Sequence, residues 1–209
     1  GGLPVVVEMS MSFSFGSLEV GVRRSPLKTT DDVLNMIAAL KKFSTVRFAG
    51  IMAYEAQVAG VGDKNPFKRL MNWPLRLMRK YSVKRVARIR KELAEKLKAA
   101  GVVCPIFNGG GTGSLSFNHA EAGVLTEVTA GSGFFCSHLF DYYTNLSLKP
   151  AAYFALQVTR QSGEGWYACQ GGGYVASGEP GWDRVPVPVV GGVLTEVTAG
   201  SGFFCSHLF

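Results

Sequence analysis

Two glycine-rich segments carry the residues with the clearest potential for chemistry. The first is residues 108–114 (NGGGTGS) and the second is residues 131–133 (GSG). Glycine lets backbone N–H groups approach an anion closely, and the hydroxyls of Thr112, Ser114 and Ser132 add further donors. Two such turns suit one phosphate group, whereas the alternative is that the glycines only tighten the chain. No lysine follows the first segment as in GxxxxGK[ST], so a nucleotide-hydrolysing loop is disfavoured.

An aromatic residue, Tyr54, follows the apolar segment 46–53. At the end of a strand, its ring could stack on a planar ligand. The alternative is that Tyr54 is an ordinary amphipathic packing residue.

Alternating strand and helix patterns should position these residues. Strands are predicted at 5–9, 46–52, 102–107 and 124–128, with one helix opening at Thr30 and another capped by Ser82 and stopped by Gly101. The apolar stripes of the helices are Val33, Leu34, Ile37 and Leu40 in the first, and Val86, Ile89, Leu93 and Leu97 in the second. This alternation of strands and helices predicts parallel β/α units. In a β/α barrel, the C-terminal ends of the strands form the active site.

The pattern changes near residue 148. Segments 151–159, 165–169 and 173–176 are typical of antiparallel strands joined by Gly and Ser turns. Residues 123–140 recur without a substitution at 192–209, which we interpret as a duplication or assembly scar whose copy packs less well. The predicted domains are 1–147 for the β/α part, 148–188 for the start of a β domain, and 189–209 for an artefactual tail.

Composition excludes wholesale disorder, because 47% of the 209 residues are hydrophobic and 18% are charged. No apolar run has the length of a membrane span and no signal peptide is recognisable, so we expect a cytoplasmic protein that does not bind membranes. The cysteines (Cys104, Cys136, Cys169 and Cys205) form no CxxC pair and are predicted to be buried thiols. His138 is predicted to be structural rather than a metal ligand.

The positive charge is local. Between Lys64 and Lys98 there are thirteen Lys or Arg against two Glu, so the rest of the chain carries −4 of the total +7. The favoured interpretation is a solvated helix face. Nucleic-acid binding is the weaker alternative, since no aromatic RNA-binding motif accompanies the charge.

Three segments carry a resemblance. Residues 47–60 (RFAGIMAYEAQVAG), 107–114 (FNGGGTGS) and 125–132 (LTEVTAGS) resemble the D-serine dehydratase and D-threonine aldolase group. These are pyridoxal-phosphate enzymes that share their barrel with alanine racemase. The likeness runs from about residue 3 to 188. It implies an α/β fold, a partial alanine-racemase-like (β/α) barrel followed by part of an antiparallel β domain.

The resemblance also implies roles for single residues. Tyr54 matches the side chain that stacks on the pyridine ring, and Arg24 lies near the position of an arginine beside the cofactor or the substrate carboxylate. Thr129 stands where alanine racemases carry an arginine facing the pyridine nitrogen, which favours chemistry other than racemisation. The other cofactor-binding residues are predicted to be Asn108, Gly110, Gly111, Thr112, Gly131 and Ser132.

Two groups that the family uses have no counterpart in the chain. The family's Schiff-base lysine lies on the first barrel strand, ahead of the segment that matches here, and none of this chain's lysines is predicted at a strand end. Several relatives also bind a divalent metal through C-terminal His and Cys or Asp ligands, which are missing here. The catalytic residue is therefore unknown, and we expect this chain alone to be inactive.

The predicted function follows from the cofactor. Pyridoxal phosphate stabilises the carbanion left when a bond to Cα breaks, and the protein selects that bond by orientation. The resemblance implies a lyase acting on small D-amino acids, by D-serine dehydratase-type deamination or D-threonine aldolase-type cleavage, with a homodimeric parent enzyme. The alternatives are a non-catalytic pyridoxal-phosphate-binding barrel and a basic nucleic-acid-binding protein.

Overall fold

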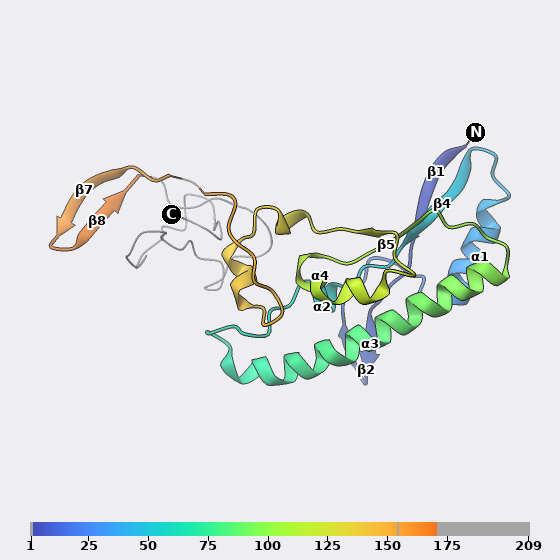
Figure 1. The fold of residues 1–209 in the computed structure, drawn as a ribbon, viewed down its shortest axis with the longest axis horizontal. Coiled ribbons are helices and arrows are strands. Elements are labelled where there is room, and N and C mark those ends of the chain that lie inside the picture. The colour runs from blue at the N-terminus through green and yellow to red at the C-terminus, as the bar shows by residue number, and fades with distance from the viewer. Residues whose placement is uncertain (1, 154, 171–209) are drawn as a thin grey trace. The chain divides into compact units, whose positions relative to one another are not determined.

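The computed structural model of the chain describes residues 2–153 and 155–170 (Figure 1). Its contacts divide the chain into two units. The first unit comprises Gly1–Asp63 and Leu70–Gly131, and the second comprises Lys64–Arg69 and Ser132–Phe209. Each unit is described by itself.

A four-stranded parallel sheet organises the first unit. Its order is β1-β4-β5-β6, formed by Leu3–Glu8, Val46–Met52, Ile106–Gly109 and Glu127–Val128. The register pairs Glu8 with Met52, Met52 with Asn108 and Gly109 with Val128, so the C-terminal ends of the strands lie abreast. The parallel sheet expected from the sequence is confirmed, although the third predicted strand starts later, at Ile106.

Close packing between strands and helices builds the core of this unit. A Cβ on Gly50 would overlap the carbonyl of Ile106 in the neighbouring strand, so only glycine lets β4 and β5 approach as they do. The buried apolar cluster includes residues from the strands and from both long helices, namely Val7, Ile51, Phe107, Val33, Ile37, Val86, Leu93 and Leu97.

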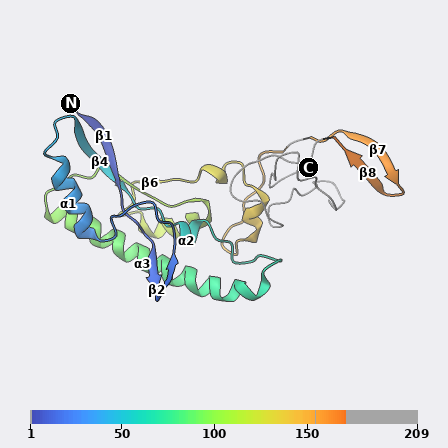
Figure 2. The same cartoon turned by 180° about the vertical axis from the view of Figure 1, so that it is seen from behind.

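Helix α1 (Thr30–Leu40) begins where the sequence predicts. Thr29 is its N-cap and forms a capping box with Asp32, which satisfies backbone N–H groups that the first helical turn leaves unpaired. Lys96 of α3 lies 2.8 Å from the Asp31 carboxylate, so the start of α1 meets the C-terminal part of α3 here (Figure 2).

Helix α3 (Arg69–Ala99) is much longer than predicted. It does not start at Ser82, which is fully buried inside the helix, and it contains Pro74. Proline removes one backbone hydrogen bond from a helix interior, so the prediction of a break there was reasonable but wrong. The predicted apolar stripe is confirmed, because Val86, Leu93 and Leu97 are buried.

The sequence reading missed a β-hairpin formed by β2 (Phe13–Phe15) and β3 (Leu18–Val20). Gly16 at its turn has a φ of 60°, a conformation that suits glycine. The remaining helices of the first unit are short: α2 (Ala56–Ala59), α4 (Leu115–Asn118) and the 3₁₀ turns η1 (Thr112–Ser114) and η2 (His119–Glu121). The 3₁₀ turn η3 (Gly131–Gly133) begins at the last residue of this unit.

The second unit contains the 3₁₀ turn η4 (His138–Tyr142) and an antiparallel hairpin of β7 (Val158–Gly163) and β8 (Trp166–Cys169). The predicted strand 151–159 is regular only from Val158, whereas 173–176 and the tail 189–209 lie outside the described residues. The predicted domain boundary at 147/148 stays a prediction.

The cysteines were predicted to be buried thiols, and His138 was predicted to be structural. Cys136 is buried, Cys104 is half-buried and Cys169 is exposed in β8, so the prediction of burial is wrong for Cys169. Cys205 lies outside the described residues. His138 bonds Asp141 at 2.8 Å and the Tyr142 hydroxyl at 2.9 Å, which confirms a structural role.

None of the helices in the part of the chain that the structure describes has the length and apolar character needed to cross a membrane.

Candidate functional site

The polar residues of interest gather at the C-terminal edge of the parallel sheet. Glu8 ends β1, and Tyr54 lies two residues beyond β4. Asn108 is the penultimate residue of β5, and Thr129 follows β6. Because these strands are parallel and in register, the residues that follow them share one edge. Tyr54, Asn108 and Thr129 thus lie at C-terminal strand ends, as the sequence predicted, and their role in chemistry stays a prediction.

Tyr54 lies against the turn that follows β5. A Cβ added to Gly111 would stand 2.9 Å from Cε2 of the Tyr54 ring and 2.8 Å from Ala59 Cβ, so the ring touches the backbone of the turn. Burial, with a smaller effect from Glu55, raises the pKa of the Tyr54 hydroxyl. The ring is therefore a neutral, half-buried platform beside the glycine turn.

Arg24 is the third member of this group. Its guanidinium lies 5.3 Å from the centre of the Tyr54 ring, and its Nε donates to Glu8 at 2.9 Å. Together with Arg23 and Lys28, Arg24 also lines a hollow on the surface. A partly exposed cation beside an aromatic ring is suited to attract a carboxylate or a phosphate.

The glycine turn does not use its N–H groups as the sequence predicted. The N–H of Gly110 donates to Glu55 at 3.0 Å, and that of Gly111 donates to the Ser114 hydroxyl at 3.0 Å. Both donors are committed inside the protein, because the turn is buried beneath its neighbours. The prediction that they are bare is therefore wrong. Thr112, also buried, begins η1.

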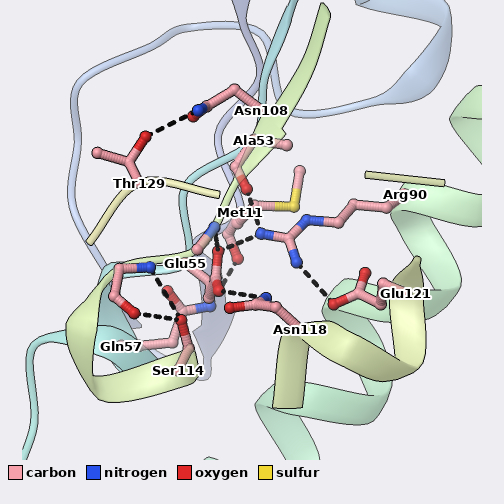
Figure 3. A network of polar contacts seen from close by, with 12 residues as sticks. Met11, Ala53, Glu55, Gln57, Arg90, Asn108, Ser114, Asn118, Glu121 and Thr129 are labelled. Carbon is pink, nitrogen blue, oxygen red and sulfur yellow. Dashed lines mark hydrogen bonds and ion pairs between the residues drawn. The ribbon is translucent and has the colours of Figure 1, made fainter. Parts of the chain in front are cut away.

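A buried polar cluster lies under the turn (Figure 3). The Arg90 guanidinium, wholly buried, forms an ion pair with Glu55 and donates to the Ala53 carbonyl at 2.6 Å. Its other amino group bonds Glu121 at 2.8 Å, and Asn118 donates to Glu55 at 3.2 Å. Burial raises the pKa of Glu121, against the opposing effect of Arg90. The cluster ties β4, α3 and the turn together.

The sequence reading missed this cluster, although a signal was present. Arg90 lies four residues after Val86 and three before Leu93, on the predicted apolar stripe of the helix. A charged residue at such a position is buried and needs a buried partner. Treating all the cations of this segment as a solvated face is therefore wrong for Arg90, and also for Arg79, which is buried against Asp63.

Asn108 connects the ends of two strands. Its amide nitrogen donates to Glu127 at 2.8 Å and to the Thr129 hydroxyl at 2.8 Å. Gly131 is exposed and has open space where a Cβ would be, while Ser132 belongs to the second unit. The roles predicted for Gly131 and Ser132 in phosphate binding stay predictions.

Within residues 2–153 and 155–170, no lysine directly follows the C-terminal end of a strand of the parallel sheet. In the same ranges, no group of three or more His, Cys, Asp or Glu is placed to hold a metal ion.

The chain has an α/β fold similar to that of a D-threonine aldolase. The crystal structure of D-threonine aldolase from Filomicrobium marinum superimposes with a TM-score of 0.60 at 22% identity, covering 78% of this chain and 38% of that one. The fold class predicted from the sequence is confirmed. An alanine racemase from Clostridium difficile 630 aligns with a TM-score of 0.46 at 18% identity, over 72% of this chain and 34% of the racemase.

In sequence, the chain is similar to a D-threonine aldolase from Arthrobacter sp, with 32% identity over 117 residues. The match covers 55% of this chain and 27% of that protein, so the chain spans about a quarter of its relative. No protein-family model matches the chain. The resemblance to the D-serine dehydratase and D-threonine aldolase group is confirmed by this relative.

Proposed function

We propose that the chain is the cofactor-binding part of a pyridoxal-phosphate-dependent lyase that acts on small D-amino acids with a β-hydroxyl group. The observation that carries the proposal is the contact of the Tyr54 ring with Gly111 beneath the Arg24 guanidinium, at the C-terminal edge of the sheet. The likeness to D-threonine aldolase in sequence and fold supports it.

The residues present fit this cofactor. Tyr54 offers a flat neutral surface for the pyridine ring. The missing side chain of Gly111 leaves room for the Tyr54 ring, because a Cβ there would collide with it. Arg24, which is ion-paired with Glu8, would be the cation next to the platform for an anionic group of the cofactor or the substrate. The Gly110 and Gly111 N–H groups are already bonded within the protein, so we do not assign them to the phosphate, and the role of Thr112 there stays a prediction.

The bound cofactor would supply an electron sink for the bond broken at Cα. The chain's own residues would hold and orient the ring and the substrate carboxylate. Thr129 is uncharged and accepts a hydrogen bond from Asn108, so this strand end presents no cation to the pyridine ring. This favours aldol cleavage or β-elimination over racemisation. We further propose that the parent enzyme is a homodimer and that this chain alone holds the cofactor without a covalent link and without turnover.

Titration of the full chain with pyridoxal phosphate, followed by absorbance, tests the proposal. Binding is expected for the chain and for Tyr54→Phe. Tyr54→Ala should bind roughly 2- to 10-fold more weakly, because an aromatic stacking contact contributes about 0.5–1.5 kcal/mol. Tyr153→Ala, which removes an exposed tyrosine of the second unit, is the control and should bind like the unmodified chain.

Other results would favour the alternatives. Absence of pyridoxal-phosphate binding would contradict the proposal, and tight retention of nucleic acid that weakens steeply with salt would then favour the basic segment as the functional surface. Turnover of D-serine or D-threonine by this chain would contradict only the claim that it is inactive.

A further inference from the structure

One buried arginine is bonded to both parts of the candidate site. We propose that Arg90 and Glu55 are a positioning pair, which sets the separation between the Tyr54 ring and the turn that follows β5. The purpose assigned to the pair, cofactor binding, rests on the proposed function, whereas its geometry does not.

The pair holds the chain on both sides of Tyr54. Nη2 of Arg90 donates to the carbonyl of Ala53 at 2.6 Å, and the same nitrogen is paired with the carboxylate of Glu55. The residues immediately before and after Tyr54 are thus bonded to one guanidinium. The Arg90 and Glu55 side chains are only 1% and 3% exposed, so water does not compete for these bonds.

The pair also holds the turn. Oε2 of Glu55, which faces Arg90, accepts the N–H of Gly110 at 3.0 Å. A Cβ on Gly109 would stand 2.5 Å from Nη2 of Arg90, so the backbone of the turn lies against the guanidinium. A displacement of Arg90 must therefore move the loop that carries Tyr54 and the glycine turn relative to each other.

Two further hydrogen bonds distinguish the Arg90–Glu55 pair from an ordinary packing contact in the core. Glu121 bonds the second amino group of Arg90 at 2.8 Å and Asn118 bonds the other oxygen of Glu55 at 3.2 Å. The guanidinium and the carboxylate each have a further partner, which fixes their orientation as well as their distance. Such preorganisation matters for a site, because a misplacement of about 1 Å can cost roughly 100-fold in function.

The test compares variants of the full chain by two measurements, amide hydrogen exchange and the Kd for pyridoxal phosphate. The main variant is Glu55→Gln/Arg90→Met/Glu121→Gln, which removes the arginine together with both carboxylates that it pairs with. Removing a buried ion pair as a whole is often neutral for stability, whereas removing one partner is not. The glutamine that replaces Glu55 keeps one acceptor oxygen, which can serve Gly110, and lacks the second carboxylate oxygen that Asn118 uses.

The expected result is faster exchange confined to the Ala53 and Gly110 amides, whose N–H groups donate to Asn108 and Glu55, and a Kd raised roughly 10-fold or more. Val86→Ala, a buried position on the same helix, is the control. It should accelerate exchange only as far as global stability falls, with the Kd unchanged. If the triple variant does not fold, Arg90→Lys is measured in the same way, since lysine keeps the charge but cannot reach both Ala53 and Glu55.

Exchange that stays unchanged at Ala53 and Gly110 in a folded variant would overturn the positioning pair, whether or not the cofactor binds. Local loosening with an unchanged Kd would overturn its role in binding. If the unmodified chain binds no pyridoxal phosphate, the proposed function and the cofactor role fail together, and hydrogen exchange alone decides the structural claim.

Discussion

Gly109, Gly110 and Gly111 each face a different side chain across the turn after β5. A Cβ at these positions would stand 2.5 Å from Arg90, 2.7 Å from Asn118 and 2.9 Å from the Tyr54 ring, respectively. Gly110 also has a φ of 80°, which side-chain-bearing residues rarely adopt. The three glycines are therefore explained by close packing around the turn.

Replacing Gly111 by alanine tests this account. The added methyl would collide with Tyr54 and Ala59, so we expect Gly111→Ala to lower the free energy of unfolding by about 1–3 kcal/mol and to weaken pyridoxal-phosphate binding. Gly123→Ala is the control, because open space surrounds that position, and it should change stability by less than about 0.5 kcal/mol. Chemical denaturation measures both, and equal effects would contradict the packing explanation.

Several site residues were predictable one by one, and their connections were not. Tyr54, Asn108 and the glycines stand out because they follow apolar segments. The pairing of Arg90 with Glu55 joins residues 35 positions apart and depends on how α3 crosses the sheet. Local patterns do not contain that information, although a charge on an apolar stripe shows that such a partner must exist.

At the scale of elements, the start of α1 is encoded by local chemistry. The Thr29 hydroxyl accepts the N–H of Asp32 at 3.1 Å, and the Asp32 carboxylate accepts the N–H of Thr29 at 2.8 Å. The hydrogen bond from the backbone N–H of Thr29 lowers the pKa of Asp32 most, and the Thr29 hydroxyl and the backbone N–H of Lys28 lower it less. The ionised carboxylate is therefore the form that the folded helix stabilises.

Removing the cap should make stability less dependent on pH. Because the folded pKa of Asp32 lies below its ordinary value of 3.8, its contribution is fully present above that value and is lost as the pH falls through the folded pKa. We expect Asp32→Asn to be less stable than the unmodified chain at neutral pH and to lose this deficit in acid. A deficit that is the same at every pH would contradict the assignment.

The hydroxyl half of the cap is tested separately. Thr29→Ala should cost about 1 kcal/mol of unfolding free energy, as for other N-cap threonines. Thr45→Ala, at an exposed threonine before β4, should cost much less. Thermal unfolding of the two variants measures the difference.

Other elements show why boundaries are harder to predict. Pro74 and Ser82 both suggest that a helix cannot have started before them, yet α3 runs through both. Tertiary contacts, including the bond from Arg79 to the Gly113 carbonyl at 3.1 Å, support the early part of the helix against its local preference. The hairpin β2–β3, by contrast, could have been found from its Gly-Ser turn and alternating pattern.

At the scale of the whole molecule, the described sheet is open. Within residues 2–153 and 155–170, the outer edges of β1 and β6 pair with no further strand. Unpaired edges are templates for association with another chain. The sequence predicted the parallel sheet from its alternating pattern, but its strand order depends on contacts between distant segments.

We expect the chain to self-associate through the β1 edge. Val6 is 46% exposed on this strand, and Val6→Lys should reduce concentration-dependent association, because an edge lysine opposes strand pairing. Leu18→Lys removes an equally apolar exposed residue from the hairpin, away from the sheet edge, and should leave association unchanged. Light scattering at several concentrations distinguishes edge pairing from general hydrophobic contact, which both variants would reduce.

The most direct test of the site is a map of backbone amide NMR shifts during addition of pyridoxal phosphate. Our prediction is that the largest shift changes fall on Tyr54, on Gly110 to Thr112 and on Thr129, all at the C-terminal edge of the sheet. Changes concentrated on the opposite edge or on the exposed face of α3, or no changes at saturating cofactor, would contradict it.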